Sequence, residues 1–190
     1  GMRFTRQGQS CTAASRIYVH ADIAEAFTKR LAERMSALKV GDGSDPSVDV
    51  GPLVNADTRD KVAAFVADAV AKGAKVECGG DIPQGKGYFY PPTVLSNVSE
   101  DADCVHDEIF GPVAAIQTFT DQEDVIRRAN DTEYGLVAYV FSENFKRALQ
   151  VCERLDYGMV GLNRGLVSDP AAPFGGTKQS GLGREGGHEG

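Results

Sequence analysis

Cys11 carries the side chain best suited to covalent chemistry, within the stretch FTRQGQSCTAASR at residues 4–16. A lone cysteine is most often a small buried hydrophobe. Cys11, however, lies outside any amphipathic stripe, two residues after a Gly-Gln pair and before a predicted strand. Because the thiolate is the reactive form, a catalytic cysteine needs surroundings that favour the anion. The position of Cys11 therefore favours a nucleophile.

Three arginines, at positions 3, 6 and 16, surround this cysteine, and no acidic side chain occurs before Asp22. Arg6 and Arg16 could stabilise a thiolate or hold an anionic substrate, and solvated or interdomain charge would explain them equally well. The whole chain has a formal net charge of -7. Nucleic acid is excluded as the main partner, because phosphate binding needs Lys and Arg gathered on one face.

The length of 190 residues suits a single domain with a real core. No apolar run reaches the roughly 18 residues of a membrane span, and the first residues do not resemble a signal peptide. Cysteines at 11, 78, 104 and 152 form no CxxC pair. We therefore expect reduced thiols, no metal site and a cytoplasmic protein.

Strands and helices alternate along the chain. A helix is predicted from Asp22, capped by that residue and ended by Gly41, and a second one ends at Gly73. The other expected elements are strands at 16–20, 74–78, 113–119, 137–141 and 159–162, an extended stretch at 88–98, and helices at 121–130 and 144–155. Such alternation predicts an α/β fold, with a mostly parallel sheet covered by helices on both faces.

The last segment, residues 163–190, is rich in glycine and shows no convincing helix or strand; we call it the glycine-rich tail. Its GLGREG at 181–186 fits the dinucleotide pattern GxGxxG. That pattern binds a pyrophosphate only between a strand and a following helix, and four residues leave no room for the helix. We expect the tail to lie over the active-site side.

Five blocks of sequence resemble the aldehyde dehydrogenase superfamily and together cover essentially the whole chain. They are the cysteine signature from Phe4 to Ser15, KVGDGSDPSVDVGPLVN at 39–55, EIFGPV at 108–113, NDTEYGLVAYVF at 130–141 and APFGGTKQSGLGREGG at 172–187. The nearest members are the succinate-semialdehyde dehydrogenases.

The resemblance implies a role for several residues. Cys11 would attack the aldehyde carbonyl, with its backbone N–H forming half of an oxyanion hole. Glu108 would accept hydrogen bonds from the nicotinamide ribose, with Phe110 packed beside the cofactor. Phe174 would line the substrate tunnel, and Ser168 would present a hydroxyl to the distal carboxylate of a semialdehyde.

Arg6 is a further candidate for binding that carboxylate. Semialdehyde enzymes typically carry an arginine six residues before the cysteine, where this sequence has Thr5, and Arg6 lies one residue along.

The resemblance also implies a larger enzyme, because family members have a nucleotide-binding domain before the cysteine segment. We expect this chain to be a catalytic-domain fragment, with NAD or NADP as the cofactor of the complete enzyme but not bound by the chain alone. Loss of a general base commonly costs 10² to 10⁴-fold in rate, so no turnover of an aldehyde is expected from the fragment. Self-association, or docking to a nucleotide-binding domain, is the expected interaction.

Two alternatives remain open. A cysteine hydrolase would need a histidine near Cys11, and the chain offers His20, His106 and His188. A non-catalytic assembly module would expose an apolar surface and associate through it.

Overall fold

The computed structural model describes residues 5–188. Contacts divide the chain into two compact units, residues 1–120 and 121–190. Phe4, the first residue of the cysteine signature, lies outside the described residues. Across residues 5–188, no helix is long and apolar enough to cross a membrane.

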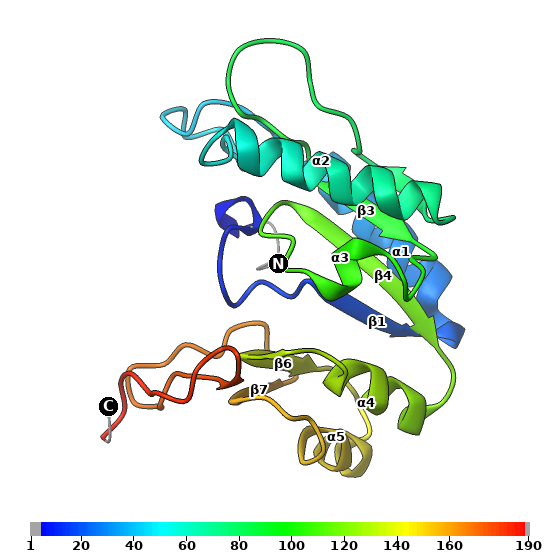
Figure 1. The fold of residues 1–190 in the computed structure, drawn as a ribbon, viewed down its shortest axis with the longest axis vertical. Coiled ribbons are helices and arrows are strands. Elements are labelled where there is room, and N and C mark those ends of the chain that lie inside the picture. Colours follow the sequence, from blue (N-terminus) through cyan, green and yellow to red (C-terminus); the bar gives the residue numbers. More distant parts are fainter. Residues whose placement is uncertain (1–4, 189–190) are drawn as a thin grey trace. The chain divides into compact units, whose positions relative to one another are not determined.

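A four-stranded sheet forms the centre of the first unit (Figure 1). Its strands lie in the order β1 (Arg16–His20), β4 (Val113–Phe119), β3 (Thr93–Ser96) and β2 (Lys75–Cys78). β4 pairs in parallel with both β1 and β3, whereas β2 pairs antiparallel with β3 at the edge. The prediction of a mostly parallel sheet in an α/β fold is confirmed.

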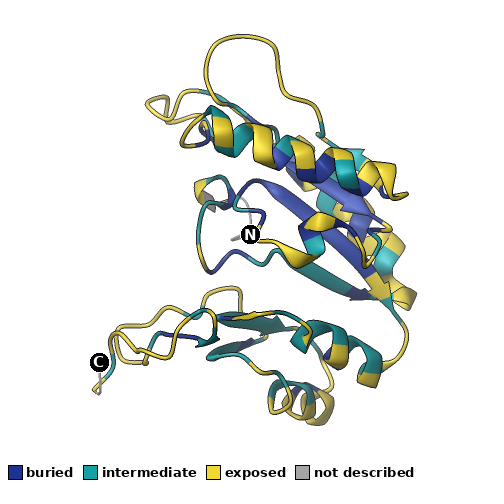
Figure 2. Ribbon diagram, viewed as in Figure 1, coloured by how far each residue is buried: buried dark blue, intermediate teal, exposed yellow. Residues whose placement is uncertain are grey.

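Helices cover both faces of this sheet. α1 (Ala21–Ser36) packs on Val94, Ala114 and Ile116, which belong to one apolar cluster with Met35 of the helix. α2 (Ala56–Ala71) and the short α3 (Asp103–His106) contribute to a second cluster, which holds the alternate strand residues Leu95, Val113 and Ala115. Successive strand residues point to opposite faces, and helices cover both of these faces. The strand β4 is therefore buried continuously from Val113 to Gln117 (Figure 2).

Over its described residues, 121–188, the second unit holds two helices and two small sheets. α4 (Gln122–Asn130) and α5 (Phe145–Cys152) accompany a parallel pair formed by β6 (Val137–Val140) and β7 (Met159–Leu162). β5 (Tyr134–Gly135) pairs antiparallel with β8 (Thr177–Lys178), so the glycine-rich tail contains a short strand that its composition did not predict.

The predicted ends of α1 are wrong. The helix begins at Ala21, and the N-cap is His20, whose Nδ1 accepts from the N–H of Asp22 at 3.3 Å. It ends at Ser36, and Gly41 instead lies in a loop where its N–H donates to the carbonyl of Val50 at 3.0 Å. In contrast, Gly73 follows the end of α2 with φ +98°, as a helix-ending glycine does.

The predicted extended stretch at 88–98 contributes a shorter strand than expected. Only Thr93–Ser96 is strand, because Pro91 and Pro92 have no N–H to donate to a ladder.

Candidate active site

A tight turn carries Cys11 on the outside of the first unit. We call residues 5–13 the Cys11 turn; it begins with η1 (Thr5–Gly8), a 3-10 segment in which Arg6, Gln7 and Gly8 all have positive φ, at 53°, 57° and 71°. Cys11 is exposed, whereas Thr12 and Ala13 directly after it are buried. The thiol is therefore open to solvent on a backbone that is anchored immediately behind it.

Glu108 and Phe110 lie on either side of an apolar anchor. Ile109 between them is completely buried in the core beneath α2, while Glu108 is exposed and Phe110 is half-buried with φ +49°. Lys61 of α2 donates to the backbone carbonyl of Glu108 at 3.1 Å. The loop thus exposes the Glu108 side chain and leaves Phe110 half-buried, on either side of a fixed residue.

Close packing against α2 also explains the glycine that follows. A Cβ on Gly111 would lie 2.4 Å from Cγ2 of Val62, so only glycine lets the loop approach the helix this closely.

The structure brings the Cys11 turn and the Glu108–Phe110 loop to the same end of the sheet, where β1 and β4 begin. β1 and β4 are parallel neighbours, with Arg16 opposite Ala115. Cys11 precedes Arg16 by five residues, and Glu108 precedes Val113 by five residues. Both segments therefore lead into the amino ends of adjacent strands. Open α/β sheets usually bind ligands at the carboxyl ends, so this site departs from the common arrangement.

The two arginines near Cys11 differ in their surroundings. Arg6 is exposed on the left-handed turn. Arg16 is half-buried on β1, where its Nη1 donates to the hydroxyl of Tyr18 at 3.3 Å and its guanidinium lies 5.9 Å from the centre of that ring. A role for Arg6 in binding substrate stays a prediction.

Ser168 and Phe174 belong to the second unit, within the glycine-rich tail. Ser168 is exposed. Phe174 is half-buried, and its backbone exchanges two hydrogen bonds with Glu185, at 2.7 and 2.8 Å. This bridge fixes the backbone that carries the ring, and the substrate roles of both side chains stay predictions.

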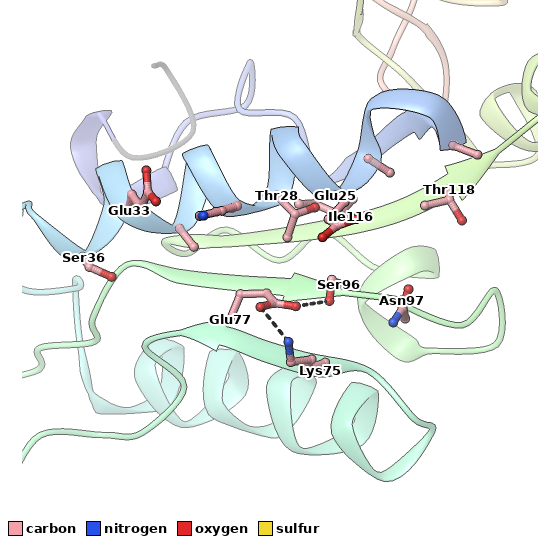
Figure 3. Close-up of a pocket in the computed structure, with 14 residues that line it drawn as sticks. Glu25, Thr28, Glu33, Ser36, Lys75, Glu77, Ser96, Asn97, Ile116 and Thr118 are labelled. Carbon is pink, nitrogen blue, oxygen red and sulfur yellow. Dashed lines mark hydrogen bonds and ion pairs between the residues drawn. The ribbon is translucent and has the colours of Figure 1, made fainter.

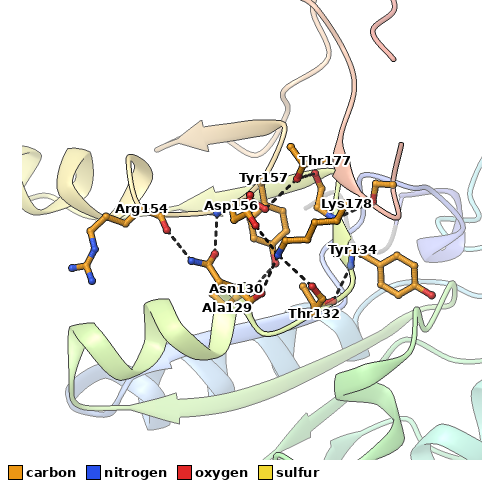
Figure 4. Close-up of polar contacts among 11 residues, drawn as sticks. Ala129, Asn130, Thr132, Tyr134, Arg154, Asp156, Tyr157, Thr177 and Lys178 are labelled. Carbon is orange, nitrogen blue, oxygen red and sulfur yellow. Dashed lines mark hydrogen bonds and ion pairs between the residues drawn. The ribbon is translucent and has the colours of Figure 1, made fainter. Parts of the chain in front are cut away.

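Lys178 of the glycine-rich tail binds other parts of the second unit (Figure 4). Nζ of Lys178 donates to the carbonyls of Asn130 at 3.0 Å and Thr132 at 3.2 Å, and it pairs with the carboxylate of Asp156 at 3.1 Å. These partners come from the end of α4 and from the segment before β7, so one ammonium group joins three parts of the chain.

Replacing Lys178 by Met is expected to loosen the tail, because the apolar side chain leaves those oxygens without their donor. The N–H of Gln179, which donates to the carbonyl of Glu133 at 3.0 Å, should then exchange with deuterium about tenfold faster. Lys146→Met, at an exposed position of α5, is the matched control and should leave that exchange rate unchanged. Equal exchange rates in both variants would contradict the fastening role.

The other three cysteines contrast with Cys11. Cys104 is completely buried, and desolvation raises the pKa of its thiol to about 11. Cys152 is half-buried, and desolvation raises its pKa as well. Cys78 is half-buried and its Sγ donates to the carbonyl of Pro92 at 3.7 Å. Exposure therefore singles out Cys11.

Alkylation with iodoacetamide at pH 8 should modify Cys11 first and Cys104 last, by a factor of about 10² or more. This order follows from the raised pKa of Cys104. Below pH 9 its thiol is protonated in the folded protein, and the reactive thiolate forms only as the pH approaches 11. Peptide mass spectrometry over time measures both rates. Faster labelling of Cys104 than of Cys11 in the folded chain would show that this contrast is wrong.

His20 lies away from the Cys11 turn along the chain and along the strand. It is the last residue of β1, whereas Cys11 precedes the first, and its ring caps α1 and packs edge-on against Phe119 at 5.3 Å between centroids. Among residues 5–188, no three His, Cys, Asp or Glu side chains gather as metal ligands.

A groove of about 770 Å³ lies elsewhere in the first unit, between α1 and the face of β2, β3 and β4 (Figure 3). At its centre, Glu77 accepts from Oγ of Ser96 at 2.6 Å and from Nζ of Lys75 at 3.1 Å, and these contacts lower the pKa of the Glu77 carboxyl. None of the six predicted site residues lines this groove. This groove and the candidate chemistry are therefore separate features.

Comparison with known proteins assigns the family. The model of the aldehyde dehydrogenase family matches residues 1–190. The chain is 50% identical over 188 residues to a succinate-semialdehyde dehydrogenase of Paenarthrobacter nicotinovorans, covering 99% of this chain and 42% of the relative. It is 45% identical over 184 residues to the NADP(+) succinate-semialdehyde dehydrogenase of Escherichia coli K12, covering 97% of this chain and 38% of the relative.

A solved structure agrees with this assignment. The crystal structure of succinate-semialdehyde dehydrogenase from Burkholderia pseudomallei superposes with a TM-score of 0.96 at 45% identity, over 98% of this chain and 39% of that one. The chain thus spans about two fifths of the length of these relatives. With the family model matching from end to end and the solved fold superposing closely, the chain belongs to the aldehyde dehydrogenase family.

Proposed function

We propose that this chain is the thiol-bearing catalytic part of an NAD(P)-dependent aldehyde dehydrogenase that oxidises succinate semialdehyde to the carboxylic acid. The observation that carries the proposal is that the exposed thiol of Cys11 lies at the same end of the sheet as Glu108 and Phe110. The names of the similar proteins support the choice of substrate.

In the proposed reaction, the sulfur of Cys11 attacks the aldehyde carbon as a thiolate. A carbon–sulfur bond forms, the carbonyl electron pair moves to oxygen, and the backbone N–H of Cys11 donates to that oxyanion. The adduct is a thiohemiacetal, which would become a thioester by losing its hydride to a nicotinamide held by Glu108 and Phe110. Water then adds to the thioester carbonyl, the carbon–sulfur bond breaks, and the acid and the Cys11 thiol are released. The turn that carries Cys11 would present the sulfur and this N–H together.

The Glu108–Phe110 loop fits a nicotinamide cofactor. An exposed carboxylate can accept from both hydroxyls of a ribose, and a half-buried ring on a left-handed backbone offers a flat face beside it. When bound, the cofactor supplies the acceptor for the hydride. Glu108 and Phe110 would hold it, and the choice between NAD and NADP is not assigned to any residue of this chain.

Three further residues are proposed to contact the substrate. Ser168, as a hydroxyl, and Arg6, as a cation, suit the distal carboxylate of a semialdehyde, and Phe174 suits its apolar chain. These roles are proposed from the resemblance, together with the exposure of Ser168 and Arg6.

The 190 residues alone are proposed not to turn over an aldehyde, because they span about two fifths of the length of their relatives. The expected partner is a nucleotide-binding domain. Four free cysteines, one of them exposed, suit a reducing compartment such as the cytoplasm.

The test joins the chain to the nucleotide-binding region of the Paenarthrobacter relative in one polypeptide. We expect this fusion to reduce NAD(P)⁺ with succinate semialdehyde, whereas the chain alone and the fusion carrying Cys11→Ala should show no reduction. The proposed function would be contradicted if the fusion folds but fails to reduce NAD(P)⁺ whichever aldehyde is added.

A further inference from the structure

Two glutamines on either side of Gly8 reach one neighbouring segment, residues 51–54. Oε1 of Gln9 accepts from the N–H of Val54 at 3.0 Å. The side-chain amide of Gln7, oriented by its hydrogen bonds, accepts from the N–H of Gly51 at 3.0 Å and donates to the carbonyl of Arg6 at 3.0 Å. The glutamines thus bind two N–H groups of the same segment and leave the Cys11 turn attached at two points.

The turn needs such attachment. Arg6 and Gln7 both occupy the left-handed region, which is unfavourable for residues with a Cβ, and Gly8 continues it. A backbone in this state persists only where surrounding contacts hold it. Within the turn, the N–H of Gln9 donates to the carbonyl of Arg6 at 2.9 Å, and that of Ala13 to the carbonyl of Ser10 at 2.9 Å.

The segment that receives the glutamines is firmly anchored. Leu53 is 3% exposed within the core cluster beneath α2, and its N–H donates to the carbonyl of Tyr88 at 2.9 Å. Val50, which precedes the segment, is 1% exposed, and α2 begins directly after Asn55. The glutamines therefore connect a strained turn to a segment that is anchored in the core of the first unit.

We propose that Gln7 and Gln9 are positioning residues for Cys11, which hold its sulfur and backbone N–H in the geometry needed to attack a carbonyl. This inference rests on the proposed nucleophilic role of Cys11. It predicts that the glutamines affect reactions that use both groups at once far more than reactions that need only an accessible thiolate.

Two reagents separate these cases. With p-nitrophenyl acetate, the Cys11 thiolate attacks the ester carbonyl, the new carbon–sulfur bond replaces the bond to p-nitrophenolate, and the thiol proton passes to solvent. That reaction develops an oxyanion and depends on the backbone N–H. Iodoacetamide alkylates the thiolate by direct displacement of iodide and has no such requirement.

Gln9→Met keeps the length of the side chain and removes its strong acceptor. We expect it to lower the acylation rate of Cys11 by about 10- to 100-fold, while the alkylation rate changes by less than about threefold. Gln9→Glu keeps an acceptor and should restore most of the rate on the high-pH plateau, although its negative charge opposes thiolate formation at lower pH. Gln84→Met, at an exposed glutamine in a loop, is the matched control and should change neither rate.

Either of two results would overturn the inference. One is an acylation rate in Gln9→Met equal to that of the unmodified chain. The other is an equal fall in both rates, which would indicate general loosening. Failure of the unmodified chain to be acylated at Cys11 would overturn the proposed function itself, and the positioning role with it.

Discussion

Replacing Cys11 by Ser is expected to abolish acylation of the chain by p-nitrophenyl acetate, with a fall in rate of at least about 10³-fold. A serine hydroxyl is far less acidic than a thiol, and the proposed mechanism gives Cys11 no adjacent base to take its proton. The release of p-nitrophenolate measures the rate, after the background hydrolysis by buffer has been subtracted.

The matched control is Cys152→Ser, which removes a half-buried thiol from α5. Its acylation rate should equal that of the unmodified chain. If instead Cys11→Ser retained the full rate, another side chain would be the nucleophile, and the Cys11 turn would not be the active site.

Replacing Ile109 by Ala should have the largest effect on stability. Ile109 is completely buried in the cluster beneath α2, and truncating such a side chain commonly costs about 2–5 kcal/mol in the free energy of unfolding. Because Ile109 is also the anchor between Glu108 and Phe110, the same change should free the loop that presents them.

Urea unfolding followed by circular dichroism measures this cost. Ile23→Ala, at a position of α1 that is 57% exposed, removes the same atoms and should change the free energy of unfolding by less than about 0.5 kcal/mol. Equal destabilisation by both substitutions would show that Ile109 does not anchor the loop in the core.

Much of the fold could be predicted because buried strands and amphipathic helices have different patterns of apolar residues. The run at 113–119 is β4, buried on both faces, and the stripe ending at Gly73 is α2. The start of α1 could not be predicted by residue type, because His20 is an uncommon cap and acts here through Nδ1. The pairing of β8 with β5 depends on residues more than 40 positions apart, so it has no local signal.

The candidate site, like the fold, could be predicted from the sequence only in part. The family resemblance predicted Cys11, Glu108 and Phe110 as site residues, and the parallel pairing of β1 with β4 brings their loops to the same end of the sheet. The contacts that hold these loops were missed, because Gln9 and Lys61 act on backbone groups 45 and 47 residues away. Two glutamines flanking a glycine before the cysteine were the only local signal.

Peptide mapping of the chain after brief reaction with p-nitrophenyl acetate shows which side chain is the nucleophile. A single acetyl group should be found on the peptide that contains Cys11, and it should be lost on treatment with hydroxylamine, as a thioester is. An acetyl group on the peptides of Cys78, Cys104 or Cys152 instead, or no thioester on the folded chain, would contradict the assignment of Cys11 as the nucleophile.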